Sequence, residues 1–372
     1  MTPEGIAGCL AGTRVLDLSQ WLPGPFATQM LADLGASVLK VEPPAGDPAR
    51  ALGPEAESGL SLFYRQVNQG KAVLRLDLKQ AADRAQFLRL VARADVLLES
   101  FRPGTLARLE LSSEALRRTN PRLVHTALSG WGQSGPYALR AGHDINYLAI
   151  GGGLARSGEA ERPRFAYPPV ADYASALLAT LVTLAGLLRR ASTGEGSFLD
   201  VSLMETVLAW QGSAQSLARR GLLERRGEAL LSGGAACYNL YRTSEGAFVS
   251  LGAIEAKFWA NFCEAMRRPD WIGRQWETFP QRALIAELAS AFAGQERAHW
   301  QHLLEPVDCC FEVVLEPDEL PAHPQVAARG LLVESGGLVQ ALFPALLDGR
   351  PPAPRADVRE LDCAAALAAW EA

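Results

Sequence analysis

Short β-branched runs that alternate with helix-like stretches are the feature that most constrains the fold. Pro25 lies near the first turn of one such stretch, with Gly35 as its stop, and residues 79–95 place apolar side chains at helical spacing. Strands that alternate with helices form a mostly parallel sheet with right-handed crossovers, so the pattern predicts an α/β fold. The strand-like runs are residues 14–19, 37–42, 72–78, 95–100 and 122–129.

The carboxyl edge of this predicted sheet is where a ligand site is expected. In open parallel sheets, ligands bind beyond the carboxyl ends of the strands, because the loops that follow the strands meet there. The segments of interest are therefore the post-strand turns at residues 19–25, 42–50, 99–104 and 129–136.

The rest of the chain predicts a second, smaller domain. Residues 172–222 have a helical pattern, broken at 192–197, whereas paired glycines, aromatic residues and a Ser-Glu-Gly turn after residue 232 indicate a β-hairpin. Helical patterns return at 255–267 and 281–304. We expect a large α/β domain (1–195), a helical linker (196–231), a small α+β domain (232–330), and a return linker whose last helix packs on the large domain (331–372).

Composition excludes several classes of protein. The chain of 372 residues is 48% hydrophobic, which suits a globular protein with a large core. Its net charge of -5 lacks the basic excess of a nucleic-acid binder. The apolar run 174–188 is short for a membrane span and predicts a buried helix, so no membrane partner is expected. The six cysteines show no C-x-x-C spacing, which argues against structural zinc; with no evident signal peptide, they favour a reducing, cytoplasmic compartment.

The glycines of "GWGQSG" (130–135) formally match a nucleotide-binding fingerprint. That fingerprint should open directly into a helix, whereas Pro136 and Tyr137 follow here. A turn that needs glycine backbone angles explains the motif better than NAD binding.

Four basic residues are candidates for binding a phosphate. Arg102 and Arg108 flank a Pro-Gly turn near a helix start, where backbone N–H groups and guanidinium groups both attract anions. Lys71 and Arg50 could converge on the same edge. The alternative for each residue is an ordinary solvated surface charge.

Three acid/base residues each have a structural and a functional interpretation. His143 follows Gly142 and is either a buried structural histidine or a group that approaches a ligand. Asp172 comes after two prolines and before a long apolar helix, so it is either a helix cap or a rigidly held base or nucleophile. Glu255 begins a helix, where glutamate is common.

Seven stretches, in order along the chain, resemble the family III CoA-transferases. "GWGQSGPY" (130–137) and "ESFRPG" (99–104) carry the resemblance to the broad family. "GHDINY" (142–147) and "GAIEAKFW" (252–259) resemble the α-methylacyl-CoA racemase branch, because the transferases generally lack that histidine.

The resemblance implies a Rossmann-like large domain, a small domain, and two chains interlocked as a homodimer. It further implies an active site between the large domain of one chain and the small domain of the other. It matches Asp172 with the catalytic aspartate, His143 with the racemase histidine and Glu255 with the racemase glutamate. Arg102 and Arg108 match groups that bind the phosphates of CoA, with Lys71 and Arg50 as further candidates, and no cofactor beyond the CoA of the substrate is implied.

Two departures bear on specificity. Pro43 and Pro44 stand where racemases often carry an arginine near the CoA adenine. The chain has only four methionines, so the Met-lined acyl path of some racemases cannot be transferred to it.

These residues suggest a two-base racemisation of a 2-methyl-branched acyl-CoA, a reaction of lipid metabolism. His143 and Asp172 would exchange the α-proton on opposite faces of an enolate, Glu255 would orient the imidazole, and the backbone N–H of Asp144 would stabilise the enolate oxygen. The alternative is a CoA-transferase that uses Asp172 as nucleophile and needs neither His143 nor Glu255. A non-catalytic CoA-binding protein is the third class.

Overall fold

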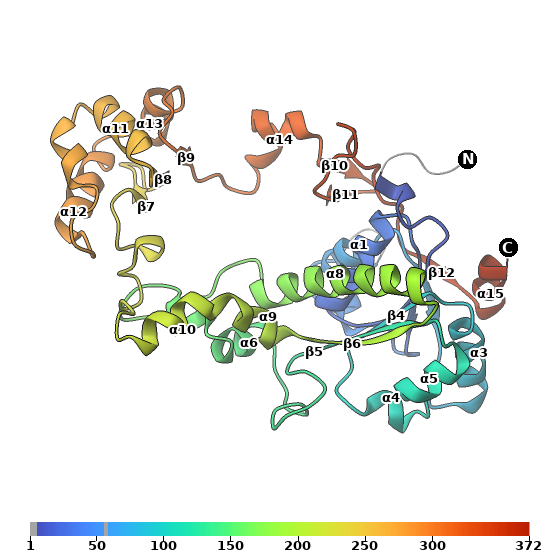
Figure 1. Cartoon of the computed structure of the whole chain (residues 1–372). Helices are drawn as coiled ribbons and strands as arrows, with labels where there is room; N and C mark the ends of the chain where they lie inside the picture. The colour runs from blue at the N-terminus through green and yellow to red at the C-terminus, as the bar shows by residue number, and fades with distance from the viewer. Residues whose placement is uncertain (1–5, 56–58, 372) are drawn as a thin grey trace. The chain divides into compact units, whose positions relative to one another are not determined.

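The computed structural model describes residues 6–55 and 59–371, which fall into two compact units (Figure 1). The first unit takes in the chain up to Gly151, Tyr167–Trp210 and the chain from Pro321 onward. The second takes in Gly152–Ala166 and Gln211–Leu320. Each compact unit is therefore assembled from several segments of the chain.

A seven-stranded sheet forms the centre of the first unit, in the order β12-β3-β2-β1-β4-β5-β6. Every neighbouring pair runs parallel, which confirms the predicted α/β fold with its large parallel sheet. The strands are β1 (Arg14–Leu18), β2 (Ser37–Glu42), β3 (Ala72–Arg75), β4 (Val96–Glu99), β5 (Val124–Ser129), β6 (Ser197–Ser202) and β12 (Arg359–Leu361).

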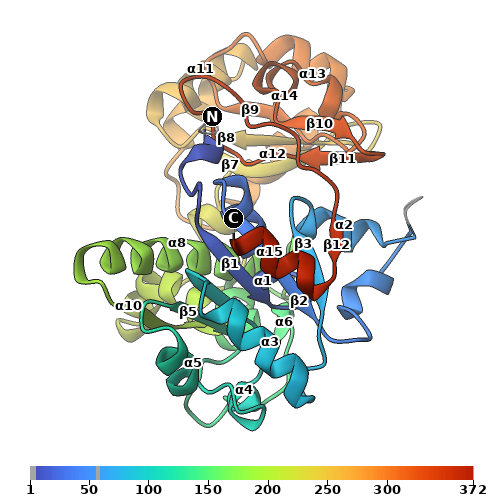
Figure 2. The same ribbon diagram turned by 90° about the vertical axis from the view of Figure 1, so that its right-hand side faces the viewer.

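Helices cover both faces of the sheet. Successive residues of a strand point to opposite faces, so each strand contributes side chains to both helical layers. On β1, Val15 packs in the cluster with Leu184 and Leu187 of α8 (Val170–Thr193), whereas Leu16 packs in the cluster with Phe87 of α3 (Ala81–Val91). The long helix α8 also contacts α1 (Pro23–Asp33). Figure 2 shows α15 (Cys363–Glu371) beside α3, where Trp370 joins the core.

The residues expected to form a helical linker (196–231) begin instead with a strand. β6 pairs with β5 along its whole length and closes one edge of the sheet. Val124 lies opposite Ser197 at one end of the pairing, and Ser129 lies opposite Ser202 at the other. As an edge strand, it alternates partly buried and exposed residues over a short span, a signal that the helical patterns on either side obscure. The helices α9 (Leu203–Leu208) and α10 (Gly212–Arg219) follow.

The second unit is built on a three-stranded antiparallel sheet and an aromatic core. The predicted hairpin is present as β7 (Tyr238–Arg242) and β8 (Phe248–Gly252), and β9 (Phe311–Val313) pairs with β8. Stacked rings fill the core beside the sheet, including Phe262 and Phe292. The helices are α11 (Ala256–Ala265), α12 (Arg282–Phe292) and α13 (Arg297–Leu304).

Shorter elements complete the two units. In the first unit, the segment expected as a return linker (331–372) contains a hairpin and β12 before its last helix. The remaining helices and strands are α2 (Leu62–Asn68), α4 (Thr105–Arg108), α5 (Ser113–Thr119), α6 (Asp144–Ile150), α7 (Gly153–Arg156), α14 (Pro324–Arg329), β10 (Leu332–Ser335) and β11 (Leu338–Ala341).

Helix α8 is buried on one side only. Ala176, Ala179 and Thr183 face the protein interior, whereas Leu181 and Leu188 on the other side are 62% and 74% exposed. By length and composition alone, α8 is long and apolar enough to cross a membrane. The prediction of a buried core helix therefore holds for the face toward the sheet and is wrong for the outer face.

A buried ion-pair network fixes the loop that leaves β1. The Asp17 carboxylate accepts hydrogen bonds from Ser19, from Thr28 at 2.6 Å and from the Lys71 ammonium at 3.0 Å. Burial would raise the pKa of Asp17, but Lys71 and Lys40 together with these hydrogen bonds hold it well below its usual range. Burial lowers the pKa of Lys71 to about 8, against the opposing attraction of Asp17.

Removal of one partner tests this network. We predict that Lys71→Met lowers the free energy of unfolding by about 3–5 kcal/mol, because it removes the cation that pairs with the buried Asp17 carboxylate. Urea unfolding monitored by circular dichroism measures the change. Lys79→Met is the matched control, since Lys79 is exposed, and should change stability by less than about 0.5 kcal/mol. A loss for Lys71→Met no larger than that of the control would contradict the assignment.

Candidate active site

A cavity of about 370 Å³ lies at the carboxyl edge of the parallel sheet, all within the first unit. Gln20 and Trp21 after β1, Arg102 after β4 and Trp131 after β5 contribute to its wall. In the sheet, β1 lies between β2 and β4, so the connections diverge to either side of it. Such a switch point is the usual place for a ligand in a doubly wound sheet, as the sequence analysis expected.

Asp172, in the first turn of α8, lines this cavity. Within the part of the chain that the structure describes, no hydrogen bond or ion pair reaches its carboxylate. Burial, and then the negative charge of Asp144, raise its pKa to about 7. The alternative interpretation of Asp172 as a helix cap is wrong, because the N-cap position belongs to Pro169.

The cap of α8 comes from Asp144, the first residue of α6. Its Oδ1 accepts the backbone N–H groups of Ala171 at 2.6 Å and of Asp172 at 3.1 Å. These first-turn N–H groups have no partner inside the helix, so the carboxylate satisfies them from another element. The sequence analysis considered only the backbone N–H of Asp144; the bridging role of its side chain depends on the packing of α6 on α8, which no local pattern reveals.

His143 lines the same cavity and is exposed, so the alternative of a buried structural histidine is wrong. It occupies the N-cap position of α6, where its backbone N–H donates to Asn146 Oδ1 at 3.1 Å. Its ring meets the Trp21 ring edge-on, with centroids 6.5 Å apart. Trp21 has a positive φ of 66°, a backbone conformation that nothing in the sequence predicts.

Tyr147 explains the glycine before His143. Its hydroxyl donates to the carbonyl of Gly142 at 2.6 Å, and a Cβ built on Gly142 would lie 2.7 Å from its ring. Gly130 has the same constraint, since a Cβ there would lie 2.3 Å from the Tyr147 hydroxyl. Both glycines line the cavity and leave room for the Tyr147 side chain. The "GWGQSG" segment forms turns with positive φ at Gly132 and Gly135 and opens into no helix, as predicted.

Of the four basic residues expected to bind phosphate, Arg102 alone lines this cavity. Burial, followed by the nearby charge of Asp172, raises the pKa of Tyr147 to about 12, and the charge of Arg102 acts in the opposite sense. Asp172, Arg102 and Tyr147 all line this cavity. Arg108 is exposed on α4, where its guanidinium donates to the Thr105 hydroxyl at 3.0 Å.

The structure places Lys71 and Arg50 in ion pairs within the protein, away from the wall of this cavity. Lys71 is 2% exposed, and its ammonium donates to Asp17, Asn68 and the Pro25 carbonyl. Arg50 pairs with Glu42 at 2.7 Å and with Glu360 at 2.9 Å. Both cations are neutralised within the protein, because parallel strands bring distant carboxylates to them.

A second, apolar cavity of about 220 Å³ adjoins the first and shares Gln20 and Phe101 with it. Its wall includes Pro43, which stands where racemases often carry an arginine, and the exposed Lys79. The remaining apolar residues of this wall are Leu18, Val41, Leu76, Leu78 and Leu109. Lys79 was not among the residues predicted from the sequence, although its position just after the β3 segment was the available signal.

Glu255 belongs to the second unit, where it is the exposed N-cap residue of α11. Its side chain makes no capping hydrogen bond, and its charge raises the pKa of the Cys310 thiol further, after the effect of burial. Across residues 6–55 and 59–371, no three His, Cys, Asp or Glu side chains are grouped in a way that would hold a metal ion.

A doubly wound sheet with an unpaired carboxylate and an imidazole at its switch point defines an α/β protein with an acid/base site. The chain belongs to CoA-transferase family III, whose sequence profile matches residues 10–357.

Known relatives of the chain include both racemases and CoA-transferases. The chain is 35% identical to alpha-methylacyl-CoA racemase of Homo sapiens, over 88% of this chain and 83% of that protein. It is 32% identical to acetyl-CoA:oxalate CoA-transferase of Acetobacter aceti, over 96% and 95%. The crystal structure of a CAIB/BAIF family protein from Brucella suis matches with a TM-score of 0.84 at 26% identity, over 97% and 98% of the two chains. The members of this family are enzymes, so the chain is an enzyme. Racemase and CoA-transferase activities both occur among its relatives.

The pKa of Asp172 provides a test of the site. We predict that Asp144→Asn lowers it from about 7, because the amide oxygen can still cap α8 while the neighbouring negative charge is removed. The measurement is a ¹³C NMR titration of the aspartate carboxyl groups, with the Asp172 signal assigned by its loss in Asp172→Asn.

Asp270→Asn, in the second unit, is the control and should leave the Asp172 titration unchanged. A wild-type Asp172 that titrates near the ordinary aspartate value of about 4 would contradict the assignment.

Proposed function

We propose that this enzyme inverts the α-carbon of 2-methyl-branched acyl-CoA thioesters by proton transfer between two bases. The observation that carries the proposal is the placement of Asp172 and His143 on one cavity, with the Asp172 carboxylate unpaired and its pKa raised to about 7. A group with a pKa near the working pH accepts and returns a proton with similar ease, as both directions of a racemisation require.

The chemistry proposed for the cavity follows from the thioester. Its carbonyl acidifies the α-carbon, because the oxygen takes up the charge of the resulting enolate. One base removes the proton from one face, and the conjugate acid of the other returns a proton to the opposite face. The backbone N–H of Asp144 lies in the first turn of α6, where helix N–H groups lack intrahelical partners, so it is proposed as the donor to the enolate oxygen.

Glu255 is proposed to orient the His143 imidazole and stabilise its charged form. Because Glu255 belongs to the second unit, this role is tied to the proposed interlocked homodimer, in which one chain completes the site of the other. Its exposed carboxylate on the N-cap of α11 is available for such a contact.

The CoA moiety is proposed to bind along the two adjoining cavities. The apolar cavity suits a flat heteroaromatic ring such as adenine, with Phe101 and Leu76 in its wall. Arg102 at the first cavity and Lys79 at the second have no ion pair among the described residues, so their charges are available to phosphate groups. Arg108 remains a further candidate on the exposed face of α4.

Deuterium incorporation tests the proposed reaction. The purified enzyme is incubated with (S)-2-methylacyl-CoA in D₂O without an acceptor acid, and mass spectrometry and chiral chromatography follow. We predict one deuterium at C2 together with loss of chirality, and a fall of about 10²–10⁴-fold in racemisation for His143→Ala, the range typical of a lost acid/base group. His299→Ala, in the second unit, is the control and should retain the wild-type rate.

The alternative is a CoA-transferase, favoured by the same unpaired carboxylate of Asp172. Asp172 would attack the thioester carbonyl and displace the CoA thiolate, which gives a mixed anhydride. The thiolate would then attack the Asp172 carbonyl, which releases the first acid and leaves an aspartyl-CoA thioester. A second carboxylate would take up the CoA by the same two steps in reverse. This reaction does not use His143. CoA transfer to an added acid that survives His143→Ala, in an enzyme that shows no deuterium exchange, would overturn the racemase proposal and establish the transferase.

The proposed homodimer is supported by the exposed leucines of α8, which include Leu177, Leu181 and Leu188. These residues recur on one helical face, and a partner chain would remove that face from water. We predict that Leu181→Lys shifts sedimentation from dimer to monomer, whereas Leu139→Lys, also at an exposed leucine, does not. Analytical ultracentrifugation makes the measurement, and a monomeric wild type would contradict the dimer.

A further inference from the structure

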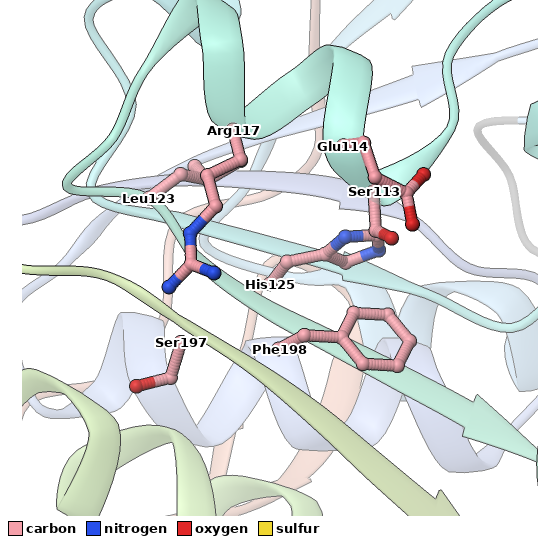
Figure 3. A pocket seen from close by; sticks show the side chains of 7 residues that line it. All are labelled: Ser113, Glu114, Arg117, Leu123, His125, Ser197 and Phe198. Carbon is pink, nitrogen blue, oxygen red and sulfur yellow. The ribbon is translucent and has the colours of Figure 1, made fainter.

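A third cavity, of about 290 Å³, lies at the amino ends of β5 and β6, the opposite edge of the sheet from the candidate active site. Figure 3 shows His125 of β5 between α5 and Phe198 of β6. Arg117 and Glu114 extend from α5, and Leu123 precedes the strand. The cavity lies wholly within the first unit and shares no lining residue with the other two cavities described above.

His125 is the feature that points to a ligand. Its side chain is 5% exposed, and neither ring nitrogen has a hydrogen-bond partner among the described residues. Buried polar groups in proteins are almost always paired, so an unpaired imidazole in the wall of a cavity marks a position where a bound molecule would complete the bonding. The Phe198 ring packs edge-on against it, with centroids 5.0 Å apart, and holds the imidazole in place.

Arg117, exposed on α5, supplies a positive charge to the wall of the cavity. Arg117 makes one hydrogen bond, to the Gly196 carbonyl at 3.3 Å, and has no ion pair within the described residues. Glu114 is exposed on the same wall and makes no ion pair with Arg117 within the described residues; its own backbone N–H and the Ser112 hydroxyl lower the pKa of its carboxyl group. The Arg117 guanidinium is therefore available to pair with a bound anion.

The protonation state of His125 allows its ring to donate a hydrogen bond to an anion. Burial lowers its pKa to about 4, so at neutral pH the ring is uncharged and carries one N–H. That hydrogen can reside on whichever nitrogen faces an acceptor. Leu123 and Phe198 supply apolar surface beside these polar groups.

We propose that this cavity binds a small monocarboxylate with an apolar or aromatic body. The carboxylate accepts hydrogen bonds from the Arg117 guanidinium and from the ring N–H of His125, and the apolar body packs on Phe198 and Leu123. The site is separate from the acid/base cavity and does not depend on the reaction proposed for it.

Benzoate is a suitable probe, and benzyl alcohol is its matched control because it lacks the carboxylate. The full-length protein is titrated with each compound, and the imidazole signals of its five histidines are followed by ¹H–¹⁵N NMR, with His125 assigned by the loss of its signal in His125→Phe. We expect saturable shifts of the His125 signal with benzoate, and binding of benzyl alcohol weaker by about tenfold or more, because a charge-assisted hydrogen bond is lost.

Variants identify the site. Arg117→Gln should weaken benzoate binding by about tenfold or more, whereas Arg118→Gln, at the neighbouring exposed arginine of α5, and Asp172→Asn, in the active-site cavity, should leave it unchanged. No saturable shift of His125, equal binding of the two compounds, or insensitivity to Arg117→Gln would each overturn the proposal. Loss of binding in Asp172→Asn would also overturn it, because benzoate would then occupy the active-site cavity.

Discussion

The hydrogen bonds from the start of α8 to the Asp144 carboxylate are the contact on which the candidate active site depends. Asp144 follows His143 directly in the chain, and its Oδ1 lies 3.1 Å from the backbone nitrogen of Asp172. One side chain therefore ties together the two elements that carry the acid/base groups. The cavity needs both elements, because α6 brings His143 to its wall and α8 brings Asp172.

The same contact accounts for the protonation behaviour of Asp172. A carboxylate in the first turn of a helix is ordinarily stabilised by the free N–H groups there, which lowers its pKa. Here Asp144 takes the N–H groups of Ala171 and Asp172, so they are not available to the Asp172 carboxylate. Burial and the charge of Asp144 then dominate and raise the pKa of Asp172 to about 7. Burial beside a second carboxylate disfavours the ionised form of Asp172, and the raised pKa suits a group that exchanges protons.

The fold was predictable from the sequence where the signal was local. The strands β1 to β5 are buried on both faces, so their continuous apolar runs identify them, and the parallel arrangement directs attention to the loops that carry Arg102 and Trp131. The role of Lys71 could not be predicted, because its partner Asp17 lies 54 residues away. Arg50 is the more extreme case, since Glu360 lies 310 residues further along the chain.

The residues around His143 show the same limit. Gly142 is visible in the sequence, and closeness to a ligand was a reasonable explanation for it. The structure shows that the glycine lines the cavity and also accommodates the Tyr147 ring. Likewise Asp144 was considered for its backbone, whereas its side chain makes the contact that positions Asp172. Sequence reasoning identified the acid/base residue types but not the contacts that hold them.

The most direct test of the account is the exchange of each substrate enantiomer by variants that retain a single base. Asp172→Asn and His143→Gln would each be incubated with the separate (R)- and (S)-2-methylacyl-CoA thioesters in D₂O. The account predicts that each variant still exchanges the C2 proton of one enantiomer, and that this enantiomer differs between the two variants. Exchange of the same enantiomer by both variants, or unchanged exchange of both enantiomers by either, would contradict the assignment of the two residues to opposite faces of one carbon.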